Sequence, residues 1–171
     1  MRRTSRRLFR ALLALLATGA ATQVVSASPA SAATYTPPAL RQQVDLNVGW
    51  KFNKGDMTGA EATGFNDSSW STVNTPHTWN AVDGADGGND YYRGIGWYRR
   101  HYTVPTSFAG KILILEFAGA NQVADVWVNG TYLGQHKGGY SRFRFGATSA
   151  LLVGQDNVIA VKVNNAKKWP Y

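Results

Sequence analysis

The sequence predicts an all-β fold, an antiparallel β-sandwich or jelly roll. Short apolar or alternating segments recur at close spacing between clusters of Gly, Asn, Asp and Pro, and no long stretch shows helical periodicity. Asn129-Gly130 joins two of these segments and favours a hairpin, because both central residues of a type I′ turn have positive φ. About 139 residues remain after the leader described below, which is enough for one sandwich core.

The expected strands alternate apolar and polar positions or form apolar runs bounded by turn residues. In chain order they span 97–104, 111–117, 124–128, 131–136, 142–145 and 157–165. Pro105 ends the first of them, since proline cannot donate to a strand ladder. The period of two separates two faces, with Asp125 and Trp127 opposite the apolar side chains of their strand. The apolar faces hold Ala124, Val126, Val128, Phe143, Phe145, Ile159, Val161 and Val163.

Two local features upstream of these strands also predict structure. The run 66–69 (NDSS) forms a turn that should let the Trp70 ring drop into the core. Gly94 and Gly96 are interpreted as points where the backbone bends before the Trp97 strand.

Residues 1–32 have the order of an export signal: an arginine-rich start, an apolar run at 11–21, and small residues ending at Ala32. The apolar run is too short to span a bilayer. The segment 5–9 (SRRLF) resembles the twin-arginine signal, which implies export of an already folded protein. An ordinary secretory signal with a fortuitous arginine pair is the alternative, and cleavage after Ala27 is the second choice. We expect a signal peptide over 1–32, a flexible tether over 33–43, and a secreted domain over 44–171.

The charge of the chain belongs mostly to the leader. The formal net charge is +8, from 18 Lys and Arg against 10 Asp and Glu, and five arginines lie in the first ten positions. Removal of the leader leaves 13 basic against 10 acidic side chains. This small excess, together with the export signal, argues against a nucleic-acid partner. We also expect no membrane partner after signal removal. The chain has no Cys, which excludes disulfides, thiolate metal sites and a cysteine nucleophile.

Hydrolytic chemistry finds little support in the residues. Glycoside hydrolysis needs two carboxylates about 5–9.5 Å apart, yet the two glutamates, Glu61 and Glu116, have no evident partner. Glu116 ends an apolar strand, where pairing with a neighbouring arginine or hydroxyl is expected. No Ser stands in a Gly-x-Ser-x-Gly elbow, and His77 is interpreted as a structural corner residue. The sequence therefore predicts no catalytic residue, and the chain alone is expected to be inactive.

One loop rich in Gly and Asp is a candidate calcium site, because hard oxygen ligands on a flexible backbone suit calcium. A solvated turn-forming loop has the same composition, so the expectation remains that no cofactor is needed. The candidate ligands are Asp83, Asp86, Asn89 and Asp90.

Aromatic residues flank this loop, and sugar rings stack their C–H faces on aromatic rings while Asp and Asn bind the hydroxyls. Core packing explains the same aromatics equally well. The aromatics concerned are Trp79, Tyr91, Tyr92, Trp97 and Tyr98.

An ordered set of motifs resembles the N-terminal sugar-binding domain of glycoside hydrolase family 2, the β-galactosidase and β-glucuronidase family. The resemblance covers essentially all of 44–166. It implies a galactose-binding-like jelly roll with the tryptophan of the hairpin packed inside. The matching stretches are 45–52, 65–70, 75–80, 92–100, 124–130, 133–134, 138–140 and 157–165.

The resemblance implies a carbohydrate partner and a set of edge residues near the bound sugar. Where β-galactosidases have Asp-Asn after a valine, this chain has Asn164-Asn165, which retains hydrogen-bonding capacity without the carboxylate. Gly146 stands where the family has Asp, so a turn hydrogen bond is expected to be lost there. The candidate carbohydrate-binding residues are Trp79, Asp90, Tyr92, Arg93, Trp97, Asn164 and Asn165.

Family members continue into an immunoglobulin-like domain and a TIM barrel that carries both catalytic glutamates, and the resemblance implies packing on both. The sequence is therefore expected to be the front part of a secreted family 2 glycosidase, incomplete at its C-terminus. Two alternatives stay open: a freestanding secreted carbohydrate-binding module or lectin, and a purely structural secreted domain that mediates protein contacts.

Overall fold

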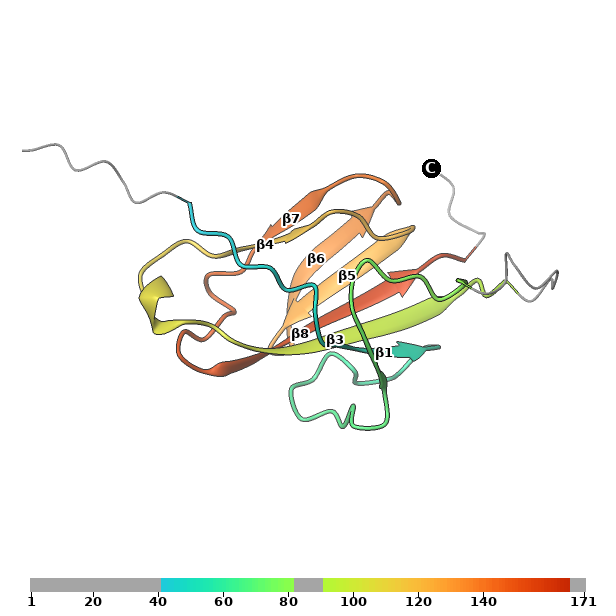
Figure 1. Ribbon diagram of the computed structural model, residues 1–171, viewed down its shortest axis with the longest axis horizontal. Helices are drawn as coiled ribbons and strands as arrows, with labels where there is room; N and C mark the ends of the chain where they lie inside the picture. The colour runs from blue at the N-terminus through green and yellow to red at the C-terminus, as the bar shows by residue number, and fades with distance from the viewer. Residues whose placement is uncertain (1–40, 82–90, 167–171) are drawn as a thin grey trace, which may run out of the picture. The chain divides into compact units, whose positions relative to one another are not determined.

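The computed structural model describes residues 41–81 and 91–166 (Figure 1). The chain divides after Arg41, and the fold below is that of the unit beginning at Gln42. The predicted signal peptide (1–32) and tether (33–43, except its last three residues) lie outside the described part, as do all four calcium candidates. No helix in the described ranges is long and apolar enough to cross a membrane.

Strands make up almost all of the regular structure, which confirms the all-β prediction. The elements are β1 (Trp50–Lys54), β2 (Ser71–Val73), β3 (Ile95–Thr103), the 3-10 turn η1 (Thr106–Phe108), β4 (Ile114–Phe117), β5 (Val123–Val128), β6 (Thr131–Lys137), β7 (Phe143–Gly146) and β8 (Asp156–Asn164).

The strands form two antiparallel sheets, as a sandwich requires (Figure 1). The larger sheet has the order β2-β1-β3-β8-β5-β6, and the smaller one pairs β4 with β7. In the large sheet β8 lies at the centre between β3 and β5, although it is the last strand in the chain. The first residues of β3 and the last residues of β8 therefore lie next to each other at one end of these strands.

The main core lies between the two sheets. Leu115 and Phe143 of the small sheet pack against apolar side chains of the large one. The period-two pattern is confirmed, since one face of β5 and one face of β8 supply most of this core. The large-sheet residues in it are Trp50, Ala124, Val126, Val128, Ile159, Val161 and Val163.

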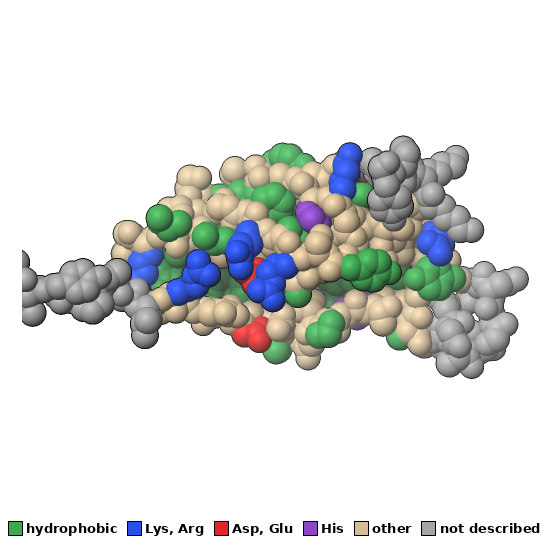
Figure 2. Space-filling model, turned by 90° about the horizontal axis from the view of Figure 1, so that it is seen from above, with side chains coloured by type: hydrophobic (Ala, Val, Ile, Leu, Met, Phe, Trp, Pro, Cys, Tyr) green, Lys and Arg blue, Asp and Glu red, His purple; other side chains and the backbone are tan. Residues whose placement is uncertain are grey.

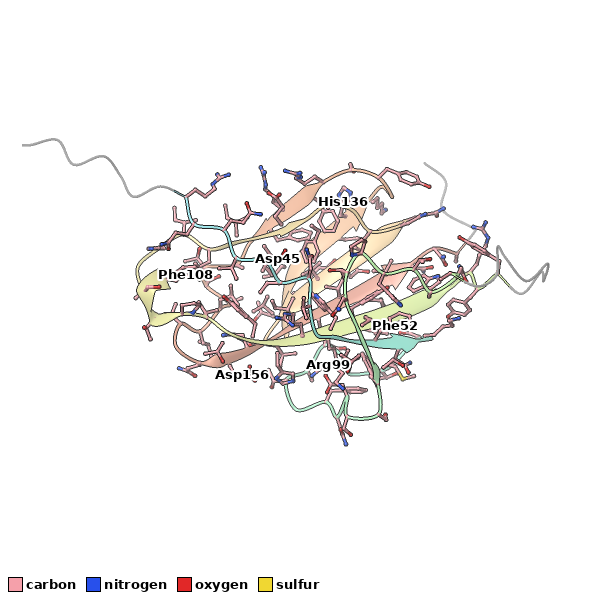
Figure 3. All side chains as sticks on the ribbon, viewed as in Figure 1. Asp45, Phe52, Arg99, Phe108, His136 and Asp156 are labelled. Atoms are coloured by element: carbon pink, nitrogen blue, oxygen red, sulfur yellow. The ribbon has the colours of Figure 1, made fainter. Side chains whose placement is uncertain are left out.

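The opposite face of the large sheet is partly covered by the loop between β1 and β2. Trp70 drops from this loop onto Trp97 and Ala160, after a turn closed by the Trp70 N–H donating to the Asp67 carbonyl over 3.0 Å. The side chain of Arg99, on β3, lies beneath the same loop (Figure 3). The sequence pattern predicted the turn and the buried ring of Trp70, and both are confirmed.

The hairpin between β5 and β6 has the predicted turn. Asn129 has φ of 50° and Gly130 has φ of 79°, which are the positive values that a type I′ turn needs. The Asn129 side chain also ties the turn to its surroundings, because its Nδ2 donates to the Ala150 carbonyl over 2.8 Å and its Oδ1 accepts from the Val158 N–H over 2.9 Å.

Some local predictions need correction. Strands β1 and β2 were not expected, the strand predicted over 111–117 begins only at Ile114, and the one predicted from Trp97 begins at Ile95. Gly94 lies in a bend directly before β3, as expected, whereas Gly96 lies within the strand. Their role is close approach: a Cβ on Gly96 would lie 2.2 Å from Trp79 Cζ3, and one on Gly94 would lie 2.7 Å from the Tyr92 hydroxyl.

Candidate functional site

The first residues of β3 and the last residues of β8 lie together at one end of these two central strands, where Ile95 pairs with Asn164. The segments 75–81 and 91–94 lie beside this end of the two strands. We call the set Trp79, Tyr92, Gly94, Asn164 and Asn165 the rim. It contains four of the seven residues that the sequence predicted for carbohydrate binding.

Asn165 holds the rim together rather than facing solvent. Its side chain is 6% exposed. Its Oδ1 accepts the Gly94 N–H over 2.7 Å, its backbone N–H donates to the Gly94 carbonyl over 2.9 Å, and its Nδ2 donates to the Tyr92 carbonyl over 3.4 Å. A buried amide with all these partners fixes the path of residues 92–94.

Asn80 clamps the same segment from the other side. Its Nδ2 donates to the Tyr92 carbonyl and its Oδ1 accepts the Tyr92 N–H, both over 3.0 Å. Two asparagines from distant parts of the sequence therefore fix the backbone of Tyr92. Sequence reasoning named Asn165 and missed Asn80.

Asn164 is the polar rim residue with hydrogen-bonding capacity to spare. Its side chain is half-buried, and its Oδ1 accepts the Ala166 N–H over 2.9 Å. Within the described ranges no acceptor is paired with its Nδ2. An amide in this position can donate to a sugar hydroxyl.

Aromatic side chains form a layer against the rim. The Trp79 ring stacks on Phe52 with a centroid separation of 5.8 Å and on Tyr98 at 6.5 Å, and it meets Tyr92 edge-on at 6.0 Å. The absence of a side chain at Gly96 lets the Trp79 ring lie directly on β3. Phe52, which Figure 3 labels on β1, was not predicted to belong to this layer.

A hollow of about 400 Å³ opens beside this aromatic layer. Lys54 contributes a cation to its wall, and the Lys54 Nζ lies 5.3 Å from the Tyr92 ring centroid. Such a mixture of ring faces, hydroxyls and one cation suits a polar ligand with an apolar face. The lining residues are Phe52, Lys54, Ser71, Val73, His77, Thr78, Trp79 and Ala81.

His77 has the structural role expected for it. Its Nδ1 lies 2.9 Å from the Tyr98 hydroxyl, and its ring meets Phe52 edge-on at 4.7 Å. Burial lowers the pKa of His77 below the usual 6.5 and raises the pKa of Tyr98, so the phenol stays protonated. A neutral imidazole with its proton on Nε2 accepts the Tyr98 O–H at Nδ1.

Trp97 must be removed from the stacking candidates. It is 3% exposed, packs on Trp127 with a centroid separation of 5.4 Å, and donates its Nε1–H to Asp56 over 3.0 Å. A ring so enclosed has no face left for a sugar. The sequence had indicated a strand from Trp97 onward but not which of its faces is covered.

The two remaining carbohydrate-binding candidates, Arg93 and Asp90, are not part of the rim. Arg93 is exposed, and its guanidinium lies 4.9 Å from the Tyr91 ring centroid. Asp90 falls outside the described residues together with Asp83, Asp86 and Asn89, so the calcium prediction stays a prediction. Among the residues that are described, no group of three His, Asp or Glu side chains could hold a metal ion.

Every described Asp and Glu except Glu61 accepts a hydrogen bond from a protein group. Glu116 lies opposite Arg144 in the β4–β7 pair and is ion-paired with both Arg144 and Arg142, as the sequence predicted. Basic side chains surround an acidic one on this face of the molecule (Figure 2). The other engaged carboxylates are Asp45, Asp56, Asp67, Asp125 and Asp156.

The sequence of this domain matches proteins of known activity. Residues 46–170 match the family described as glycosyl hydrolases family 2, sugar binding domain. A β-glucuronidase of Formosa agariphila is 41% identical over 133 residues, which cover 73% of this chain and 14% of that protein. A β-galactosidase of Bacteroides ovatus is 36% identical over 136 residues, which cover 75% of this chain and 16% of that protein.

Solved structures agree with these relatives. The crystal structure of a Bacteroides uniformis β-glucuronidase superposes with a TM-score of 0.68 at 41% identity, covering 72% of this chain and 14% of the other. The chain thus spans about one seventh of the length of the proteins it resembles. It belongs to glycoside hydrolase family 2 and contains the sugar-binding domain of that family.

Proposed function

We propose that this domain forms part of the sugar-binding wall of a secreted family 2 glycosidase that hydrolyses O-glycosyl bonds of β-glucuronides or β-galactosides. The names of its relatives support this substrate class. The observation that carries the proposal is the rim, where the Asn164 amide nitrogen has no acceptor among the described residues and lies beside a backbone fixed by Asn165 and Asn80. A donor on a rigid frame costs little conformational entropy when it binds a hydroxyl.

The reacting acids of this glycosidase are proposed to lie outside the domain. A retaining glycosidase needs two carboxylates about 5–5.5 Å apart, and one of them must be free to attack the sugar. The described carboxylates other than Glu61 are engaged in structural hydrogen bonds or ion pairs. The catalytic pair would belong to a TIM barrel, with this domain packing on it and on an immunoglobulin-like domain.

Secretion completes the proposal. The leader over 1–32 would direct export by the twin-arginine route, and the carbohydrate would be an extracellular one. The support is the order of charged, apolar and small residues in the sequence.

A titration of the full chain with methyl β-D-glucuronide and methyl β-D-galactoside tests the rim. We expect amide signals of Gly94, Asn164 and Asn165 to shift in heteronuclear NMR spectra, and Asn164→Ala to weaken the binding. The matched control is Asn53→Ala, because the Asn53 side chain donates to the carbonyl of the next residue and is not part of the rim. The same chain should not hydrolyse chromogenic versions of these glycosides.

Two outcomes would contradict the proposal. Saturable shifts that leave the rim amides untouched would place the sugar elsewhere. Hydrolysis that disappears in Glu116→Gln would show that the domain carries its own acid.

A further inference from the structure

Three aromatic rings form a row across the face of the large sheet that points away from β4 and β7. Trp97 of β3 and Trp127 of β5 lean toward each other over the small Ala160 of β8, with ring centroids 5.4 Å apart. Tyr132 of β6 continues the row, with its ring centroid 5.2 Å from that of Trp127. The row ends at β6, which is an edge strand of the sheet.

Exposure rises along the row. Trp97 is 3% exposed, Trp127 is half-buried, and Tyr132 is 52% exposed. Tyr132 is nevertheless held in place, because its ring packs on Trp127 and its hydroxyl donates to Asp125 Oδ1 over 2.8 Å. An exposed ring fixed at both ends is preorganised to be a stacking surface.

A β-bulge places a second polar group beside the ring. Asp125 pairs with Gln135 and Trp127 pairs with Tyr132. The two paired positions are thus two residues apart on β5 but three residues apart on β6, which therefore has one extra residue. Without the bulge, Tyr132 and Gln135 would point to opposite faces of the sheet. With it, the Gln135 Nε2 reaches Asp125 Oδ1 over 2.9 Å, on the same face as the ring.

The register of the central strand brings a cation to the same place. Lys162 of β8 pairs with Asp125 on one side and with Trp97 on the other. Its Nζ lies 5.6 Å from the Trp97 ring centroid. A carboxylate, an amide and an ammonium therefore lie in one row next to the row of rings.

We propose that Tyr132, Asp125, Gln135 and Lys162 form a glycan-binding platform separate from the rim. Its ligand class is a neutral oligosaccharide of β-linked pyranoses with equatorial hydroxyls. Such sugars expose flat C–H faces that stack on a tyrosine ring, while the hydroxyls at their perimeter meet donors and acceptors. The carboxylate of Asp125 lies at the centre of the polar row and disfavours a polyanion such as a nucleic acid or a sulfated glycan.

The platform and the rim share the central strand β8 but do not lie at the same place. Lys162 is two residues from Asn164, or about 7 Å along β8, but Tyr132 and Gln135 lie on β6, which is separated from β8 by β5. Binding at either place can therefore be recognised by its own amide signals.

A titration of the full chain with cellohexaose and xylohexaose tests the platform by heteronuclear NMR. We expect the Trp127 indole N–H and the amides of Tyr132 and Gln135 to shift, while Gly94 and Asn164 do not. Tyr132→Ala should weaken the binding about tenfold, and Tyr132→Phe should weaken it less because the ring remains. The matched control is Tyr140→Ala, since Tyr140 is 93% exposed and lies outside the platform.

Gln135→Ala keeps the test decisive if Tyr132→Ala fails to fold, because the Gln135 side chain is exposed. Absence of shifts with both oligosaccharides would overturn the platform, as would binding that Tyr132→Ala and Tyr140→Ala reduce equally. Shifts confined to the rim amides would also overturn it while supporting the proposed function, so the two proposals fail independently.

Discussion

At the scale of single residues, one buried cation organises the loop between β1 and β2. The Arg99 side chain is 0% exposed and its Nε lies 2.9 Å from Asp67 Oδ2. Its Nη1 donates to the carbonyls of Ala60 and Ala62, and its guanidinium lies 5.3 Å from the Phe65 ring centroid. A buried guanidinium is tolerated because its donors find these acceptors.

Replacement of Arg99 by Met should cost about 3–5 kcal/mol of unfolding free energy, because Asp67 and the loop carbonyls lose their donor. Urea denaturation followed by tryptophan fluorescence measures this loss. The control is Arg142→Met, whose side chain is 63% exposed beside Glu116 and should cost no more than about 1 kcal/mol. Equal costs for the two variants would show that the buried network does not hold the loop.

His77 should make stability depend on pH in one direction. Burial lowers its pKa in the folded state below the 6.5 of an exposed histidine, so the unfolded chain binds more protons as the pH falls below 6.5. This group therefore stabilises the fold fully above 6.5, and its contribution is lost as the pH falls toward the lowered value.

The measurement compares unfolding free energies of the natural chain and His77→Gln at about pH 7.5 and about pH 5.5. We expect the variant to lose less stability between these two conditions, because glutamine does not titrate. An identical loss in both proteins would show that protonation of His77 is not disfavoured by the fold.

At the scale of elements, the sequence pattern predicted the strands β3 to β8 and missed β1 and β2. The residues 124–128 alternate clearly and pack one face on each core, as expected. The residues of β1 also alternate, with Trp50 and Phe52 apolar and Lys51 and Asn53 polar, so its pattern was present in the sequence and was missed. The three residues of β2 are too short for a period to show.

The rim was predictable only in part for the same reason. Its polar members come from motifs, but the hollow beside Trp79 depends on Phe52 and Lys54, whose strand was not recognised. Trp97 was wrongly proposed to stack on a sugar for a similar reason. The sequence pattern shows that its side chain projects from a strand, but the burial of that face depends on the loop between β1 and β2, which packs over it.

Gly96→Ala should disrupt the contact between β3 and the segment carrying Trp79. The added Cβ would lie 2.2 Å from Trp79 Cζ3 and 2.6 Å from Cε3, so the ring must move off the sheet. We expect a loss of about 1–3 kcal/mol in unfolding free energy, measured by urea denaturation. Gly146→Ala is the matched strand glycine, because no atom lies within 4 Å of its new Cβ and its stability should hold.

At the scale of the whole molecule, the domain combines a closed core with two separate polar surfaces. The rim lies where β3 begins and β8 ends, and the platform lies on one face near the β6 edge. The chain has no Cys, so the fold closes without disulfides. A fold that closes without disulfides can form in a reducing compartment, which suits export in the folded state.

The proposed export route predicts a sharp effect of two conservative substitutions. Arg6→Lys together with Arg7→Lys preserves the charge of the leader, so a route that senses only charge would be unaffected, whereas a twin-arginine route should fail. We expect the natural chain to be secreted with its N-terminus at residue 33, and the double variant to remain uncleaved inside the cells. Mass spectrometry of the medium and the cell fraction measures both. Arg2→Lys with Arg3→Lys makes the same two substitutions outside the motif, also without changing the charge, and should leave export intact. Normal secretion of the Arg6 and Arg7 variant would instead assign the leader to the ordinary secretory route, in which the chain crosses unfolded and its rim forms only outside the cell.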